Sequence, residues 1–215
     1  MKPNRWLCKL LAALCAGCSG DSVPRRVIEF YGDSLTFGSI AGPSGELTRL
    51  DVPPVRRAQA LLGSDTLCVD LSLPGATVRD AINGVAMMPF DRFVDHVAST
   101  TADTLVIRYG GADALRGVPV EAFEADLGTL TAMALNAGKT VLLVGVIATP
   151  SGATDPFNQA VERVAGALGA AFVDVRAVPV TWPDDLADAV HPAQAWSDRM
   201  TAAIVLAIND ADMLR

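Results

Sequence analysis

Two short stretches at opposite ends of the sequence hold the residue types that nucleophilic catalysis requires. Near the start, Ser34 follows a glycine and an acid at the end of the bulky segment 27–31. Near the end, His191 lies three residues after Asp188 and directly before a proline. A serine hydroxyl becomes a nucleophile when a histidine removes its proton, and a carboxylate can orient that histidine and stabilise its charged form. Ser34, His191 and Asp188 are therefore the candidate nucleophile, base and orienting acid.

The Gly-Asp-Ser stretch also has a simpler structural interpretation. A Gly-Asp-Ser turn occurs in many α/β proteins, where the serine only caps the next helix, and short motifs carry a real risk of chance matches.

The other of the two histidines, His96, lies in the segment 90–97, which has the pattern of an amphipathic helix. A surface or capping role is expected for His96, because no ligand set accompanies it. No metal site and no cofactor are predicted.

The elements that must position these residues are predicted to alternate between strands and helices. Five short bulky runs are expected to form strands, at Arg26–Tyr31, Leu67–Leu73, Thr104–Tyr109, Thr140–Val146 and Ala171–Val175. The segments between them are long enough for crossover helices, which favours a parallel sheet covered on both faces. The clearest helix is predicted at Val120–Ala137, and Pro192 is expected to begin a final helix. Ser34 then lies at the carboxyl end of the first strand, where ligands bind in open α/β sheets.

The order of the motifs resembles one known family. Two stretches match the pattern of the SGNH, or GDSL, hydrolases: Gly32-Asp33-Ser34-Leu35 and Asp188-Ala189-Val190-His191-Pro192. The family's second block, a glycine, matches Gly75, and its third block, Gly-x-Asn-Asp, matches Gly110-Gly111-Ala112-Asp113. The run 105–117 is most similar to the arylesterase and lysophospholipase/thioesterase branch. The resemblance implies a flavodoxin-like, three-layer α/β/α sandwich with a five-stranded parallel sheet, and a serine esterase that acts through an acyl-enzyme on Ser34.

The resemblance also implies an oxyanion hole. In the family its donors are the backbone N–H groups of the serine and the second-block glycine, and the side chain of the third-block asparagine. These positions correspond to Ser34, Gly75 and Ala112, and the methyl group of Ala112 donates nothing. Loss of one such donor typically slows catalysis about 100- to 1,000-fold, so reduced activity is expected.

Three hypotheses for function follow. The first is an esterase with a weakened oxyanion hole. The second is a non-catalytic glycan- or lipid-binding lipoprotein on the same fold, whose hydrolase ability decayed at Ala112. The third is a flavodoxin-like module that holds a phosphate in the first turn, which leaves Asp188 and His191 unexplained.

Other residues near the motifs have smaller expected roles. Asp33 is expected to fix the first turn by local hydrogen bonds, Asp113 to brace the third-block loop, and Thr36 to cap the following helix. The segments 38–54 and 87–90 are predicted as loops that select the substrate. Their small or apolar residues slightly favour a small acyl ester, such as an O-acetyl group, over a thioester, and a lysophospholipid stays open.

The first 20 residues have the layout of a signal peptide, with an early positive charge and an apolar stretch too short to span a membrane. Within them, the residues after the apolar stretch, 14–20, resemble a bacterial lipobox with Cys18 as the lipidated cysteine, although Cys15 stands where leucine is usual. An ordinary cleaved signal is the alternative. We expect an exported, membrane-tethered lipoprotein on the periplasmic side or cell surface, with residues 21–215 as one hydrolase domain.

Composition excludes some classes of partner. The net charge is −7 and no basic run is present, so the chain lacks the electrostatic features of a nucleic-acid-binding protein. Cys68 is the one cysteine beyond the leader, so no internal disulfide can form in that domain, and a core-filling role is expected for it.

Overall fold

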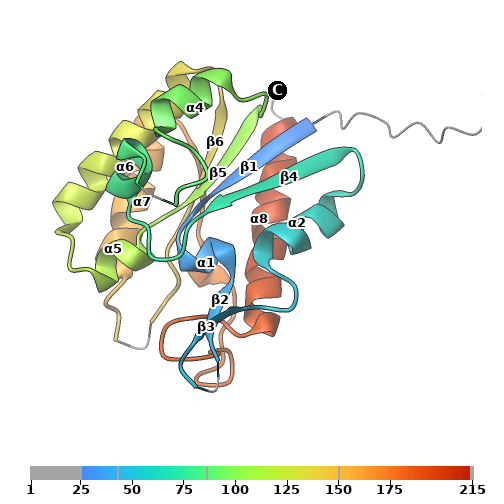
Figure 1. Ribbon diagram of the computed structural model, residues 1–215, viewed down its shortest axis with the longest axis vertical. Coiled ribbons are helices and arrows are strands. Elements are labelled where there is room, and N and C mark those ends of the chain that lie inside the picture. Colours follow the sequence, from blue (N-terminus) through green and yellow to red (C-terminus); the bar gives the residue numbers. More distant parts are fainter. Residues whose placement is uncertain (1–25, 43, 86, 150, 214–215) are drawn as a thin grey trace, which may run out of the picture.

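The centre of the fold is a parallel sheet of five strands in the order β4-β1-β5-β6-β7 (Figure 1). The computed structural model describes residues 26–213 except 43, 86 and 150, so the predicted leader and Cys18 lie outside the described residues. The strands are β1 Arg26–Gly32, β4 Thr66–Ser72, β5 Thr104–Arg108, β6 Thr140–Val144 and β7 Ala171–Val173. The five predicted strands are confirmed, each with bounds within two residues of those expected.

Helices cover both faces of the sheet, which completes the predicted three-layer α/β/α sandwich. One face is covered by α2 Pro54–Leu62 and α8 Gln194–Met213, and the other by α3 Val78–Asn83, α4 Phe93–Ser99, α6 Val120–Asn136 and α7 Asp155–Leu168 (Figure 1). Two shorter helices, α1 Ser34–Phe37 and α5 Gly111–Leu115, follow β1 and β5, and a 3-10 turn, η1 Val175–Ala177, follows β7. No helix in the described part of the chain has both the length and the apolarity to cross a membrane.

The main core lies between the sheet and its two helical layers. Every residue of the central strand β5 is buried, and its continuous apolar run is typical of a strand packed on both faces. The predicted helix at Val120–Ala137 is confirmed, and Phe123 and Leu130 on it are fully buried. Cys68, on the edge strand β4, packs half-buried against this core, and burial raises the pKa of its thiol to about 11.

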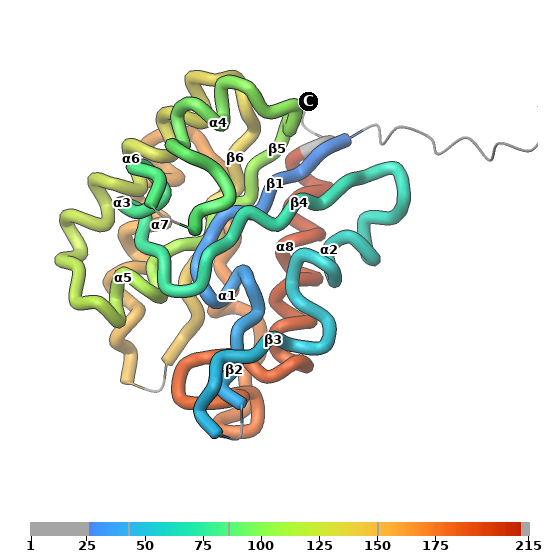
Figure 2. Tube along the Cα trace, viewed as in Figure 1, coloured from blue at the N-terminus to red at the C-terminus, as the bar shows by residue number. Residues whose placement is uncertain are grey.

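The segment 38–54 is more ordered than the predicted loop. It contains a two-stranded antiparallel hairpin, β2 Ser39–Ala41 and β3 Leu47–Arg49, which lies next to the chain that leads into α8 (Figure 2). The side chain of Gln194 holds its far end, because it accepts from the Val52 N–H at 3.1 Å and donates to the Val52 carbonyl at 2.9 Å. Such short strands depend on contacts with distant residues, so local sequence patterns did not indicate them.

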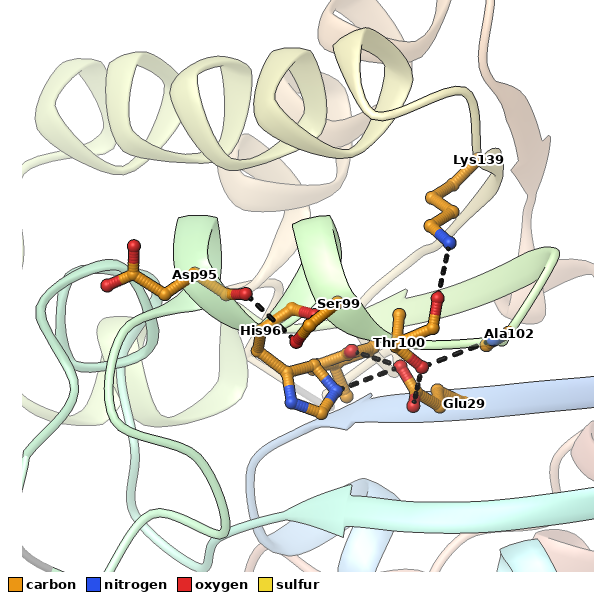
Figure 3. A network of polar contacts seen from close by, with 8 residues as sticks. Glu29, Asp95, His96, Ser99, Thr100, Ala102 and Lys139 are labelled. Carbon is orange, nitrogen blue, oxygen red and sulfur yellow. Dashed lines mark hydrogen bonds and ion pairs between the residues drawn. The ribbon is translucent and has the colours of Figure 1, made fainter.

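One charged residue, Glu29, lies in the middle of strand β1. Its carboxylate is buried and accepts hydrogen bonds from the Tyr31 hydroxyl and the Thr100 hydroxyl, each at 2.5 Å. His96 Nε2 lies 3.2 Å from the same carboxylate (Figure 3). The prediction of a surface or capping role for His96 was therefore wrong. Its ring is half-buried and links α4 to the central sheet, because Glu29 must find polar partners inside the fold.

Candidate active site

The turn after β1 presents Ser34 at the carboxyl edge of the sheet. Asp33 is the N-cap residue of α1, and its carboxylate accepts the N–H groups of Leu35 and Ala112, each at 2.9 Å. Complete burial raises the pKa of Asp33, and these two N–H bonds act against that rise. Asp33 thus fixes the turn, as predicted. The predicted cap at Thr36 was wrong, because Asp33 occupies the capping position.

Gly32 allows the tight packing that this turn requires. A Cβ atom on Gly32 would lie 2.1 Å from Thr36 Oγ1 and 2.4 Å from the Arg108 carbonyl oxygen, so no larger residue fits without a shift. Thr36 Oγ1 is buried against this glycine inside α1. The close contact between β1, α1 and β5 leaves Ser34 in one defined position.

The structure brings Ser34, His191 and Asp188 into one chain of hydrogen bonds, although 157 residues separate Ser34 from His191. His191 Nε2 lies 3.0 Å from Ser34 Oγ, and His191 Nδ1 lies 2.8 Å from Asp188 Oδ2. Burial alone would raise the pKa of Asp188. Hydrogen bonds from the Val190 N–H, the His191 ring and the Ala41 N–H outweigh it and lower that pKa from 3.8 to about 2. Asp188 is therefore an anion at neutral pH, in hydrogen-bond contact with the imidazole.

The loop that carries His191 is closed by its own hydrogen bonds. Asp188 Oδ1 accepts the N–H groups of Val190 and His191, each at 2.8 Å, and the Ala187 N–H donates to the His191 carbonyl at 2.9 Å. Pro192 pairs with Leu186 in a single β-bridge. Because of this closure α8 begins at Gln194, and not at Pro192 as predicted.

Gly75 lies in the turn after β4, close to the end of β1. The Leu73 N–H donates to the Gly32 carbonyl at 3.0 Å, which draws this turn against the strand that carries Ser34. Gly75 has a φ of +79°, a conformation that favours glycine. The Gly75 turn therefore begins at a contact with Gly32, the last residue of β1, two residues before Ser34.

Ala112 is buried at the start of α5, and its backbone N–H is bonded to Asp33. It therefore has a methyl side chain and an N–H group that is already used. Asp113 braces this loop as predicted, through a partner in a different segment, since Asp113 Oδ1 accepts the Val78 N–H at 3.3 Å. Burial raises the pKa of Asp113 to about 7, although the N–H bond from Val78 acts against this rise.

A cavity of about 340 Å³ opens beside the hydroxyl of Ser34 and the ring of His191. Its lining is largely apolar and includes Leu35, Ala114, Leu115, Val146, Ile147 and Val190. Much of its wall comes from the loop between β6 and α7. The described residues of 38–54 and 87–90, which were expected to select the substrate, do not line it. Leu47, Met87 and Pro89 instead border a separate open groove, which Pro74 also lines.

The loop between β6 and α7 was missed as part of the site. Val146 and Ile147 continue the apolar run of β6 beyond the last paired residue; Val146 was predicted as the end of the strand, and Ile147 was given no role. Apolar residues beyond the carboxyl end of a parallel strand are the one signal in the sequence that indicated this wall.

Within the described residues, no three His, Cys, Asp or Glu side chains gather as a possible metal site.

The doubly covered parallel sheet, with a serine and a histidine–aspartate pair at its carboxyl edge, defines the fold of the SGNH hydrolases. The sequence profile of the GDSL-like Lipase/Acylhydrolase family matches residues 30–197, and the chain belongs to this family. The match includes Ser34, the Asp188–His191 pair and the two intervening blocks.

Solved structures share this fold at low sequence identity. Est24, a carbohydrate acetylesterase from Sinorhizobium meliloti, is 17% identical with a TM-score of 0.70, over 86% of this chain and 99% of that one. The aryl esterase of M. smegmatis is 18% identical with a TM-score of 0.70 over the same shares. Axe2, an acetylxylan esterase from Geobacillus stearothermophilus, is 22% identical with a TM-score of 0.69, over 85% of this chain and 94% of that one. No curated protein sequence matches the chain.

Proposed function

We propose that this protein is a serine esterase that cleaves a carboxylic ester through an acyl-enzyme on Ser34. The observation that carries the proposal is the hydrogen-bond chain from Ser34 Oγ through the His191 ring to Asp188. A nucleophile within reach of a base, with the base oriented by a third group, is the geometry of nucleophilic acyl transfer. Membership of the acylhydrolase family supports the same reaction class.

The proposed reaction has two halves. Ser34 Oγ attacks the ester carbonyl while His191 Nε2 takes its proton, and the tetrahedral intermediate collapses when the imidazolium returns that proton to the leaving alcohol. A water then attacks the acyl-enzyme, with His191 again as base, and the carboxylic acid leaves Ser34. Asp188, an anion at neutral pH, accepts from Nδ1 and so keeps Nε2 available for the proton of Ser34.

The substrate is proposed to place its acyl group in the apolar cavity beside Ser34. A small acyl ester, such as an O-acetyl group on a carbohydrate, is one candidate, and two similar structures are an acetylesterase and an acetylxylan esterase by name. A lysophospholipid is the other candidate. A cavity of about 340 Å³ with an apolar lining has room for more than an acetyl group, which favours the longer chain.

A second candidate function is a non-catalytic glycan- or lipid-binding protein on this fold. Ala112 favours it, because its side chain has no donor and its N–H is bonded to Asp33. It predicts ligand binding that survives Ser34→Ala, without turnover in either protein.

We also propose export and lipidation at Cys18. A mass increase from the lipid that disappears in Cys18→Ser would test this proposal.

Hydrolysis of p-nitrophenyl acetate, with Ser34→Ala prepared identically, tests the proposal. Hydrolysis is expected to disappear in the variant, and a fluorophosphonate is expected to add one adduct to Ser34 by intact mass. Equal rates in both proteins, with no adduct on folded protein, would reject the esterase and leave the binding protein.

A further inference from the structure

The group that faces Gly75 is the side chain of Arg116. A Cβ atom built on Gly75 would lie 3.5 Å from Arg116 Nη2, and apart from Gly75 and its two chain neighbours no other heavy atom of the described residues comes within 4 Å of it. Arg116 directly follows α5, the short helix that begins with Gly111 and Ala112. A cationic nitrogen donor therefore lies close to Gly75, in the turn that contacts the end of β1.

The guanidinium of Arg116 is held in this orientation by Asp80. Arg116 Nη1 lies 3.2 Å from Asp80 Oδ2, so one nitrogen of the planar group is anchored while Nη2 lies close to Gly75. Asp80 is itself fixed, because it belongs to the capping box of α3 and accepts the Thr77 N–H at 3.0 Å. The backbone is tied as well, since the Arg116 N–H donates to the Ala112 carbonyl at 3.0 Å.

The proposed acyl transfer needs donors aimed at the oxygen that becomes negative in the tetrahedral intermediate. The backbone N–H groups of Ser34 and Gly75 are two candidates. Ala112 supplies neither a side-chain donor nor a free N–H, because Asp33 accepts that N–H. A methyl group at this position also occupies less space than a carboxamide, which leaves room for a neighbouring side chain to approach.

From these contacts we infer that Arg116 is a catalytic residue whose Nη2 donates to the oxyanion in place of an Ala112 side chain. This inference rests on the proposed esterase function. A guanidinium is always charged and presents several donors, so it needs no change of protonation to stabilise a negative oxygen. The side chain of Arg116 is 56% exposed, and solvent therefore weakens its effect relative to a buried donor.

A double-mutant cycle between positions 112 and 116 tests this role, with hydrolysis of p-nitrophenyl acetate as the assay. Arg116→Ala is expected to lower kcat about tenfold with little change in KM, less than the roughly 100-fold cost of a buried donor. Ala112→Asn should raise kcat only slightly in the natural background, and should restore most of the loss in Arg116→Ala. Strong coupling of this kind is the signature of two groups that serve one function.

Arg79→Ala is the matched control. Arg79 is another exposed arginine of this layer, paired with Asp126, and its loss should leave kcat unchanged. Three outcomes would each overturn the inference while leaving the esterase intact. The first is an unchanged kcat in Arg116→Ala, and the second is an effect of Arg116→Ala on KM alone. The third is that Arg116→Ala lowers kcat equally with alanine and with asparagine at position 112. If neither the natural protein nor Ala112→Asn exceeds its Ser34→Ala counterpart, the proposed function fails and the role of Arg116 fails with it.

Discussion

Two histidine–carboxylate pairs occur in the described part of the chain, and they differ in what lies around them. His191 Nδ1 is 2.8 Å from Asp188, and its Nε2 is 3.0 Å from Ser34 beside an apolar cavity. His96 Nε2 is 3.2 Å from Glu29, a carboxylate that also accepts two hydroxyl groups (Figure 3). Similar pairs thus have different surroundings. A carboxylate beside an imidazole does not by itself indicate chemistry, which also requires a nucleophile and space for a substrate.

Their positions on the sheet explain the difference. The His191 pair lies at the carboxyl edge, where strands end and loops leave a cavity. The His96 pair lies over the middle of β1, where the ring of His96 packs 5.3 Å from Phe90 and 6.1 Å from Tyr31, measured between ring centroids. The first pair is therefore positioned to meet a ligand, and the second joins a helix to the sheet.

Replacing each histidine by glutamine should separate the two pairs most clearly. His191→Gln is expected to lower kcat/KM about 1,000-fold or more, because it removes the proposed base. His96→Gln should stay within about twofold of the natural protein, because it touches no group of the proposed reaction. Ester hydrolysis by both variants checks this. A comparable loss in His96→Gln, with the protein still folded, would contradict the distinction.

The next largest effect is expected on stability, at the other pair. Glu29→Ala should lower the free energy of unfolding by about 2–4 kcal/mol, because it leaves the buried hydroxyl of Tyr31 and the half-buried hydroxyl of Thr100 without their acceptor. Glu29→Gln keeps an acceptor and serves as the milder comparison. Urea denaturation measures both. Unchanged stability in Glu29→Ala would show that the hydrogen bonds to Glu29 make no net contribution to the free energy of unfolding.

A smaller effect should follow from the lowered pKa of Asp188. Because this pKa is about 2 in the folded protein and 3.8 ordinarily, the unfolded chain binds more protons between these values. The resulting stabilisation, about 2 kcal/mol, is complete above about pH 4 and is lost as the pH falls towards 2. Urea denaturation between pH 6 and 2.5 should show a shallower acid loss in Asp188→Asn. Parallel curves for the two proteins would refute this contribution.

The smallest effect is expected at the contact between Gln194, the first residue of α8, and Val52. Gln194→Ala removes two hydrogen bonds to the backbone of Val52, at an expected cost of about 1 kcal/mol because the site is exposed. Thermal denaturation and kcat, measured together, should show a slight fall in both. Asp198, which accepts from the same amide, should be replaced in parallel as a control for that contact. A rise in the melting temperature or in kcat for Gln194→Ala would show that the contact with Val52 is unfavourable for stability or for activity.

Local patterns predicted the strands and the main helices, since a bulky run or a helical face is visible in neighbouring residues. The pairing of Ser34 with His191 was predicted from their residue types and the order of the motifs, and only the position of Ser34 at the carboxyl edge of the sheet came from topology. The partner of His96 was hidden, since Glu29 lies 67 residues away in a strand that was interpreted as apolar. The cavity wall at Val146 and Ile147 was hidden too, because an apolar residue at a cavity and one in the core have the same sequence signal.

The hydrogen bonds between Gln194 and Val52 have an evolutionary consequence. Gln194 recognises only the main chain of its partner, so any residue that keeps the backbone in place can occupy position 52. Among descendants of a common ancestor, these two positions should therefore not change identity in concert. The length of the hairpin segment should instead be inherited together with the length of the segment between Asp188 and Gln194. An insertion in one of these two segments would move Val52 and Gln194 out of contact.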